Sequence, residues 1–168
     1  MKTVWATAGM AILLFLGGCA TVEPPPAPHK PRAPSGPAPA LSPVSIAPGT
    51  WRAAVDSWLG VPYRYGGLDR RGIDCSGFTR QIYRSVAGID LPHNAAAQYG
   101  AGRSVARGAL RPGDLVFFSE PGRGVFHVGL SLGSDQFAQA SVQRGVIISS
   151  LRETYYAPRW CGTRRIIP

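Results

Sequence analysis

The sequence predicts an α+β domain in the last two thirds of the chain. Two observations predict this class. Apolar residues recur at helical spacing between residues 51 and 99, whereas short alternating strands follow the Pro112-Gly113 turn. Helices first and antiparallel strands afterwards are typical of an α+β domain. The first third of the chain has a different composition, so we expect it to stay outside the packed core.

Residues 1–18 have the outline of an export signal, with Lys2, an apolar stretch and small residues before Cys19. The apolar stretch is shorter than the roughly 20 residues of a membrane-spanning helix. The run Leu16-Gly17-Gly18-Cys19 resembles a bacterial lipobox, which predicts a lipid on Cys19 and a membrane anchor. An ordinary secretory signal is the alternative. In such lipoproteins an aspartate after the cysteine favours the inner membrane, so Ala20 indicates the outer membrane of the cell envelope, facing the periplasm.

Residues 19–50 are predicted to be the lipidated cysteine and a linker. Prolines dominate from Glu23 to Pro48, and large apolar side chains are almost absent, so this segment cannot fold alone. An extended polyproline chain would reach on the order of 80 Å. The folded domain is therefore expected over residues 51–168, held at a distance from its anchor.

The helices come first in this domain. Apolar spacing predicts helices over residues 51–59 and 75–86 and a third, short helix over 93–99. Gly60-Val61-Pro62 ends the first of them. Residues 63–67 are then expected to be extended chain that enters a loop.

The strands follow the turn at Pro112-Gly113. Alternating apolar residues predict an antiparallel meander of five strands, at 114–118, 126–132, 136–142, 146–150 and 163–167. The second and third strands are joined by Gly133-Ser134-Asp135, which predicts a three-residue hairpin loop. With that loop, residues 127 and 139 share a sheet face. A loop of two residues would separate them, barring a bulge.

Cys75 is a candidate nucleophile. It follows Asp74, a good helix N-cap, so its thiol is expected in the first turn of a helix. Free amides and the macrodipole at a helix start favour a thiolate, and they lower a reference pKa of about 8.5. A buried structural cysteine is the alternative.

His127 is a candidate base for that thiol. Strand alternation places His127 and Gly129 on one face. A glycine inside a strand indicates close approach, here by the helix that carries Cys75 or by a substrate backbone. Gln139 is expected to accept a hydrogen bond from the second ring nitrogen and so orient the ring. A hydrogen-bonded histidine on a half-exposed sheet is the alternative.

Charge and cysteine content restrict the partners. Eighteen basic against nine acidic residues give a net charge of +9, which suits an anionic partner, although a solvated basic face is equally open. Nucleic acid is not expected, because no basic helix or aromatic stacking platform stands out. Cys75 and Cys161 could form one disulfide, which would block the nucleophile, so we expect Cys161 to be a free, partly buried thiol. Three scattered histidines give no metal-ligand spacing, and no cofactor is indicated.

Residues 51–168 resemble the NlpC family of cell-wall cysteine peptidases. Five stretches carry the resemblance in order and spacing: residues 60–67, 72–78 (Gly-Ile-Asp-Cys-Ser-Gly-Phe), 111–118, 127–129 (His-Val-Gly) and 140–146. The resemblance implies a papain-like fold. By position it makes Cys75 the nucleophile and His127 the general base, and it places the Tyr63 hydroxyl at the oxyanion. It also places Asp74 and Ser76 where the family contacts substrate, although Asp74 is equally well explained as the helix cap.

The resemblance further implies hydrolysis of peptidoglycan stem peptides, at the bond between D-glutamate and meso-diaminopimelate. One position departs from the family pattern, because the third polar residue is most often histidine and is Gln139 here. A glutamine carbonyl can accept the same hydrogen bond. Two alternatives stay open: a catalytically weak lipoprotein that binds peptidoglycan, and a papain-like amidase or acyltransferase that acts on another amide. The sequence identifies no particular protein partner, and whether one exists stays open.

Overall fold

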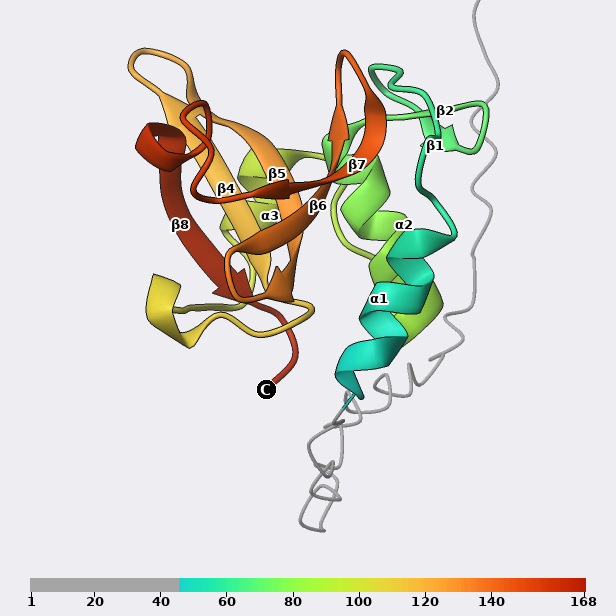
Figure 1. The fold of residues 1–168 in the computed structure, drawn as a ribbon, viewed down its shortest axis with the longest axis horizontal. Helices are drawn as coiled ribbons and strands as arrows, with labels where there is room; N and C mark the ends of the chain where they lie inside the picture. Colours follow the sequence, from blue (N-terminus) through green and yellow to red (C-terminus); the bar gives the residue numbers. More distant parts are fainter. Residues whose placement is uncertain (1–45) are drawn as a thin grey trace, which may run out of the picture. The chain divides into compact units, whose positions relative to one another are not determined.

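The computed structural model describes residues 46–168. The predicted export signal, the lipidation site Cys19 and most of the predicted linker lie outside the described residues. The described chain is an α+β domain, as predicted, with its helices gathered against one face of a sheet (Figure 1). No helix in this part of the chain is both long and apolar enough to cross a membrane.

A six-stranded antiparallel sheet forms the centre of the domain, in the order β3-β8-β4-β5-β6-β7. Strands β4 to β7 are the predicted meander, but β8 returns to lie between β3 and β4. A separate hairpin of β1 and β2 and the short β3 were not predicted, since each has only two residues. The strands are β1 Leu68–Asp69, β2 Gly72–Ile73, β3 Arg103–Ser104, β4 Leu115–Glu120, β5 Gly124–Gly133, β6 Gln136–Ser141, β7 Gly145–Ser150 and β8 Trp160–Arg165.

Three α-helices cover one face of this sheet. They are α1 Pro48–Asp56, α2 Cys75–Ala87 and α3 Ala95–Tyr99. Two 3-10 turns lie in the connections between strands, η1 Arg107–Ala109 between β3 and β4 and η2 Ala157–Arg159 between β7 and β8. Helix α1 begins at Pro48, three residues before the predicted start of the domain. Trp51 and Val55 are buried, but the chain leaves the helix after Asp56, which leaves Leu59 44% exposed. The helix predicted to extend to residue 59 therefore ends three residues earlier.

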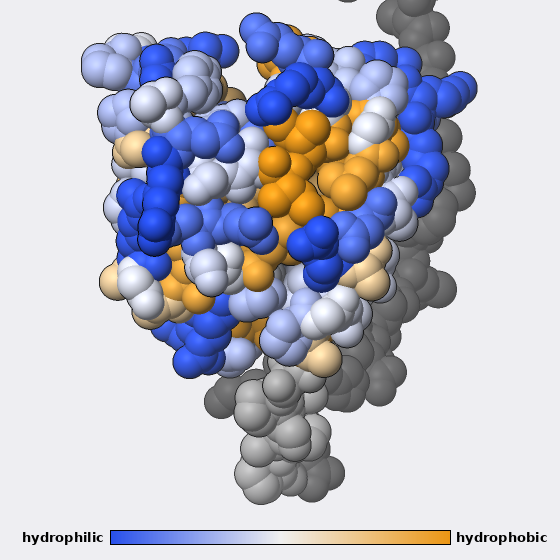
Figure 2. Space-filling view, viewed as in Figure 1, coloured by the Kyte–Doolittle hydropathy of each residue, from blue (hydrophilic) through white to orange (hydrophobic). Residues whose placement is uncertain are grey.

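The two faces of the sheet bury different cores, as strand alternation requires. Phe117 packs with the helices in the larger cluster, whereas its neighbour Phe118 packs with Phe137, Leu151 and Tyr156 on the other face. Strand β7 forms one edge of the sheet. Its Ile147 and Ile148 are only half-buried, and apolar surface is visible over this strand in Figure 2.

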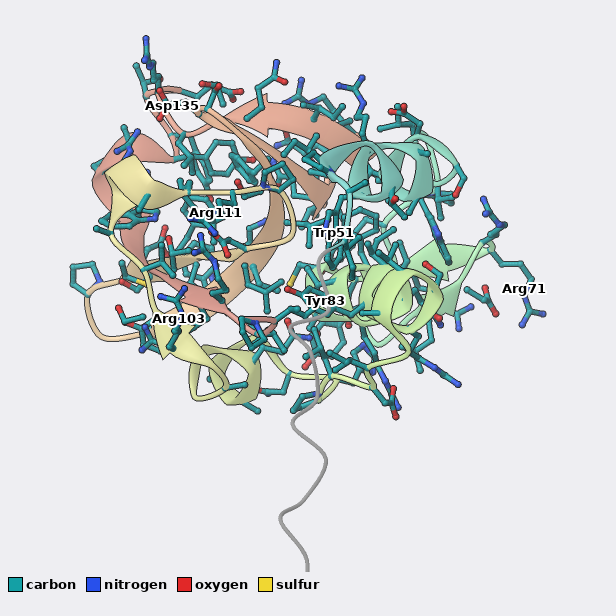
Figure 3. All side chains as sticks on the ribbon, turned by 90° about the horizontal axis from the view of Figure 1, so that it is seen from below. Trp51, Arg71, Tyr83, Arg103, Arg111 and Asp135 are labelled. Carbon is teal, nitrogen blue, oxygen red and sulfur yellow. The ribbon has the colours of Figure 1, made fainter. Side chains whose placement is uncertain are left out.

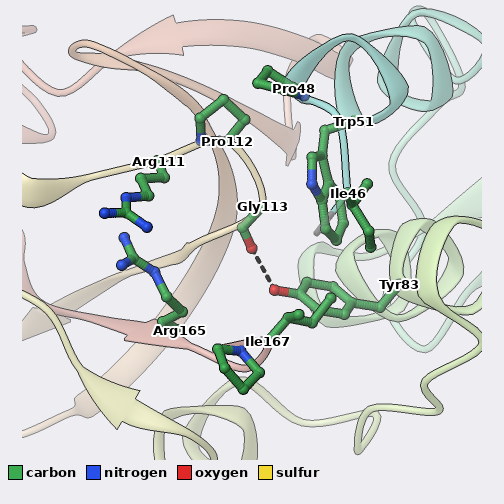
Figure 4. Close-up of a pocket in the computed structure, with 10 residues that line it drawn as sticks. Ile46, Pro48, Trp51, Tyr83, Arg111, Pro112, Gly113, Arg165 and Ile167 are labelled. Atoms are coloured by element: carbon green, nitrogen blue, oxygen red, sulfur yellow. Dashed lines mark hydrogen bonds between the residues drawn. The ribbon is translucent and has the colours of Figure 1, made fainter. Parts of the chain in front are cut away.

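The Pro112-Gly113 turn joins the sheet to the helices. Gly113 has a φ of +95°, and an added Cβ would lie 2.6 Å from the indole ring of Trp51. Trp51 and Tyr83 point into the space between helices and sheet, whereas Arg71 projects away from the domain (Figure 3). The Tyr83 hydroxyl donates to the Gly113 carbonyl beside a cavity of about 260 Å³ (Figure 4). None of the predicted catalytic residues lines this cavity.

Candidate active site

Cys75 is the first residue of α2, as its sequence context predicts. Asp74 is the N-cap, with extended backbone, and its Oδ1 accepts a hydrogen bond from the Gly77 amide at 2.7 Å. The cap fixes where the helix starts and therefore where the thiol lies. Cys75 and Cys161 are both free thiols, and Cys161 is partly buried, so the expectation that they are not joined by a disulfide is confirmed.

The Asp74 carboxylate is fully engaged within the domain. Besides Gly77, it accepts hydrogen bonds from the Gly66 amide at 2.9 Å and the Ser76 hydroxyl at 3.0 Å, and His93 Nε2 lies 2.9 Å from it. These contacts tie the start of α2 to two loops. His93 was not singled out in the sequence, because nothing local marks a partner 19 residues away. Contact of Asp74 and Ser76 with substrate stays a prediction.

The thiol of Cys75 approaches the sheet beside His127. Its sulfur lies against the backbone N–H of Val128, the residue that follows the histidine. The thiol can approach β5 here because β5 pairs with β6 only between Gly133–Gln136 and Leu130–Ala138. Val128 therefore has no paired residue on β6. Within residues 46–168 no hydrogen bond joins the thiol directly to the imidazole, as is common in enzymes without bound substrate.

His127 Nε2 lies 2.6 Å from Gln139 Oε1. Since a carbonyl oxygen can only accept, Nε2 is the protonated nitrogen and Nδ1 is left to act as the base. The hairpin of β5 and β6 brings residues 127 and 139 together, but its loop differs from the predicted one. Its loop has two residues, Ser134 and Asp135, and a bulge between Ser131 and Gly133 shifts the register by one. The expected three-residue loop is therefore wrong, but the bulge restores residues 127 and 139 to one face.

Two hydroxyl groups hold the Gln139 amide from the side opposite to His127. Its Nε2 donates to Ser149 Oγ at 2.9 Å and to the Tyr156 hydroxyl. Gln139, Ser149 and Tyr156 are all buried, with 1%, 5% and 8% exposure, so the buried amide nitrogen finds both of its hydrogen-bond acceptors within the domain. Ser149 and Tyr156 were missed in the sequence analysis, and only the pairing of β6 with β7 and the return of the chain at η2 bring them here.

Burial controls the charge of the catalytic pair. It raises the pKa of Cys75 to about 11, although the N–H groups of Val128, Ser76 and Cys75 itself act to lower it. Burial also lowers the pKa of His127 to about 4, against the opposing effect of its hydrogen bond to Gln139. The expectation of a lowered thiol pKa is therefore wrong for the free protein. At neutral pH the pair consists of a thiol and an uncharged imidazole.

The predicted catalytic residues meet in one cavity of about 490 Å³. Tyr63, Cys75, His127 and Gln139 all line it. Burial, and after it the proximity of Cys75 and Asp74, raises the pKa of Tyr63, so this phenol stays protonated and able to donate. Neither Asp74 nor Ser76 lines the cavity.

The sequence predicted that Gly129 lets the helix of Cys75 or a substrate backbone come close to the strand. The structure gives another reason for this glycine. A Cβ added there would lie 2.5 Å from Phe137 Cδ2 and 2.8 Å from the Ala138 carbonyl oxygen. The space is therefore needed by the neighbouring strand, and the expectation of contact with the helix or with substrate is wrong.

Comparison with known proteins agrees with this arrangement. The family model described as the NlpC/P60 family matches residues 60–165. The chain belongs to the NlpC/P60 family. The recognition made from the sequence motifs is thereby confirmed, and the papain-like NlpC fold agrees with solved structures of the family.

Three relatives of this NlpC/P60 domain bear on its function. The chain is 46% identical to the Escherichia coli protein named murein DD-endopeptidase MepS/murein LD-carboxypeptidase, over 66% of this chain and 58% of that relative. It matches an NlpC/P60 family structure from Bacillus cereus with a TM-score of 0.69 and 32% identity, covering 74% of this chain and 42% of the other. It also matches RipD from Mycobacterium tuberculosis, described as a non-catalytic NlpC/p60 protein adapted to peptidoglycan binding, with a TM-score of 0.60 and 25% identity over 71% and 97% of the two chains.

Proposed function

We propose that this protein is a cysteine endopeptidase that hydrolyses the peptide stems of peptidoglycan. The observation that carries the proposal is the array of Cys75, His127 and Gln139 in one solvent-accessible cavity of an NlpC/P60 domain. The name of the 46%-identical relative, a murein endopeptidase, supports the same substrate class.

In the proposed reaction, Cys75 attacks a stem-peptide carbonyl while His127 Nδ1 takes the thiol proton. The uncharged ground state found here means that this proton moves as the sulfur attacks. The Tyr63 hydroxyl and the Cys75 amide donate to the developing oxyanion. The imidazolium then protonates the leaving amine, and water attacks the thioester to release the acyl group and restore the thiol.

The stem-peptide bond has two candidates. The family resemblance favours the bond between D-glutamate and meso-diaminopimelate, whereas the name of the 46%-identical relative favours the D,D cross-link. Digestion of defined muropeptides followed by mass spectrometry distinguishes them, because the two cleavages leave different fragments. The same spectra would reveal an acyl transferase by its condensed products.

The experiment that tests the proposal compares the wild-type protein with Cys75→Ala on purified sacculi. We expect the wild-type protein to solubilise sacculi and the variant to release no more material than buffer. Cys161→Ala is the matched control and should retain wild-type activity, since Cys161 lies outside the cavity. Equal solubilisation by Cys75→Ala and wild type would refute the mechanism.

A binding protein without catalysis is the second candidate, favoured by Gln139 and by the likeness to non-catalytic RipD. This candidate predicts that the wild-type protein sediments with sacculi but releases no soluble fragments. The orientation of Gln139 toward His127 argues for catalysis, because the required tautomer is already present.

We also propose that the protein acts from a lipid anchor at Cys19, on the outer membrane and facing the periplasm. The lipobox-like run Leu16–Cys19 supports this location. In cell fractionation, a Cys19→Ala protein should move from the membrane to the soluble fraction. An unchanged membrane association would contradict the anchor.

A further inference from the structure

Two arginines line the catalytic cavity and have no role in the mechanism described above. Arg123 lies in the β4–β5 connection and Arg144 in the β6–β7 connection, so they reach the same cavity from different hairpins. The 14 lining residues include one acid, Glu153, and its Oε1 already accepts the Ser150 amide at 2.7 Å. The cavity around the nucleophile therefore carries a net positive charge.

Arg144 lacks a partner in the described part of the chain. Among residues 46–168 it forms neither an ion pair nor a side-chain hydrogen bond, although most arginines of the domain form one or the other. An exposed arginine costs little to leave unpaired, but its five donors are free to bind an anion.

Arg123 packs against an aromatic ring, and its guanidinium forms only a long ion pair. Its guanidinium lies 4.8 Å from the centre of the Phe126 ring, which restricts the side chain. The nearest acid, Glu120, is 3.9 Å from Arg123 and lies closer to Arg159, at 2.8 Å. The charge of Arg123 also reaches the catalytic residues, since it opposes the rise in the pKa of Tyr63 that burial causes.

We propose that Arg123 and Arg144 form a carboxylate subsite, which holds a free carboxylate of the stem peptide beside the amide bond that is cleaved. Guanidinium groups bind carboxylates through paired, charge-assisted hydrogen bonds. The subsite distinguishes stem peptides with free carboxylates from those in which the same groups are carboxamides. This inference deepens the proposed function and rests on it.

The subsite is tested by binding, without relying on turnover. The protein carries Cys75→Ser, and the ligands are a synthetic stem tetrapeptide, L-alanyl-γ-D-glutamyl-meso-diaminopimelyl-D-alanine, and versions with each carboxylate replaced in turn by a carboxamide. Isothermal titration calorimetry measures the affinities. We expect one carboxamide to weaken binding by about tenfold, because a charge-assisted pair is lost.

Substitution of the arginines should reproduce that loss. Arg144→Gln and Arg123→Gln should each weaken binding of the free acid by about tenfold and leave binding of the sensitive carboxamide unchanged. Arg103→Gln is the matched control. Arg103 is equally exposed but lies on β3, the sheet edge opposite to β7, so its loss should change neither affinity.

Equal affinity of the protein for the free acid and for all carboxamides would overturn the subsite. The subsite would also be overturned if the arginine variants lost as much affinity for the sensitive carboxamide as for the free acid. Parallel digestion of sacculi by the wild-type protein separates this failure from failure of the proposed function. If sacculi are digested while the carboxylates make no difference, peptidoglycan hydrolysis stands and the subsite is wrong. If no stem peptide is bound and no sacculus digested, both are wrong.

Discussion

At the scale of single residues, burial sets how the catalytic pair titrates, because Gln139 brings no charge to His127. A carboxylate at this position would favour the imidazolium, but an amide leaves burial as the dominant influence on His127. With pKa values of about 4 for His127 and about 11 for Cys75, both groups keep one protonation state across neutral pH. The dependence of kcat/KM on pH should therefore be flat from roughly pH 5 to pH 10.

Gln139→Glu should change the acid side of this profile. The new carboxylate would lie beside Nε2, and an opposite charge at that distance raises a histidine pKa by roughly one to three units. A raised pKa means that the protonated ring, which cannot act as a base, persists to higher pH. The acid limb of kcat/KM should move upward accordingly. Gln143→Glu makes the same change on the cavity rim and should leave the acid limb in place; an unmoved limb in Gln139→Glu would contradict the direct contact.

Tyr156 acts at the same scale as a positioning residue, because it holds the Gln139 amide that orients His127. Tyr156→Phe removes an acceptor and lets the amide turn. We expect kcat to fall roughly ten- to hundredfold while KM changes little. Nitrogen NMR of His127 should show loss of the single Nε2–H tautomer, which a merely structural defect would not produce. Tyr155→Phe, on the cavity rim, should leave both the rate and the tautomer unchanged.

At the scale of elements, the sequence predicts the structure correctly where one local signal decides it. Asp74 before an apolar repeat marked the start of α2, and alternation marked β4 to β7. The prediction failed where contacts between distant segments decide the local structure. The bulge in β5 depends on pairing with β6, and the burial that sets the Cys75 pKa depends on packing against the strand of Val128.

The start of α2 is the element on which the nucleophile depends. Asp74→Ala should leave the amides of Gly66 and Gly77 without an acceptor and should lower the free energy of unfolding by about 2–3 kcal/mol. Asn94 caps α3 in an exposed position, so Asn94→Ala should cost only about 0.5–1 kcal/mol. Urea unfolding of the two variants measures the difference. Equal losses would show that the wider Asp74 network adds nothing to an ordinary cap.

At the scale of the whole molecule, one buried ion pair joins three segments that are far apart in the sequence. Arg165, near the end of β8, binds both oxygens of Asp114 at 2.7 Å, and Asp114 precedes β4. Arg165 Nη2 also donates to the Ala109 carbonyl in η1 at 2.9 Å. Asp114 and Arg165 are 2% and 8% exposed, so neither charge can be replaced by water contacts if the other is lost.

Arg165→Met should therefore be among the most destabilising single changes in the domain. It leaves the Asp114 carboxylate buried without its counter-charge, at a cost of about 3–5 kcal/mol in urea unfolding. Arg111→Met is the matched control. It removes an exposed arginine that lines the same cavity as Arg165 (Figure 4), and it should change the free energy of unfolding by about 0.5 kcal/mol or less. Adding Asp114→Asn to Arg165→Met removes the stranded charge and should restore part of the loss. A double variant no more stable than Arg165→Met alone would place the cost in lost packing of the long arginine side chain instead of in the buried carboxylate.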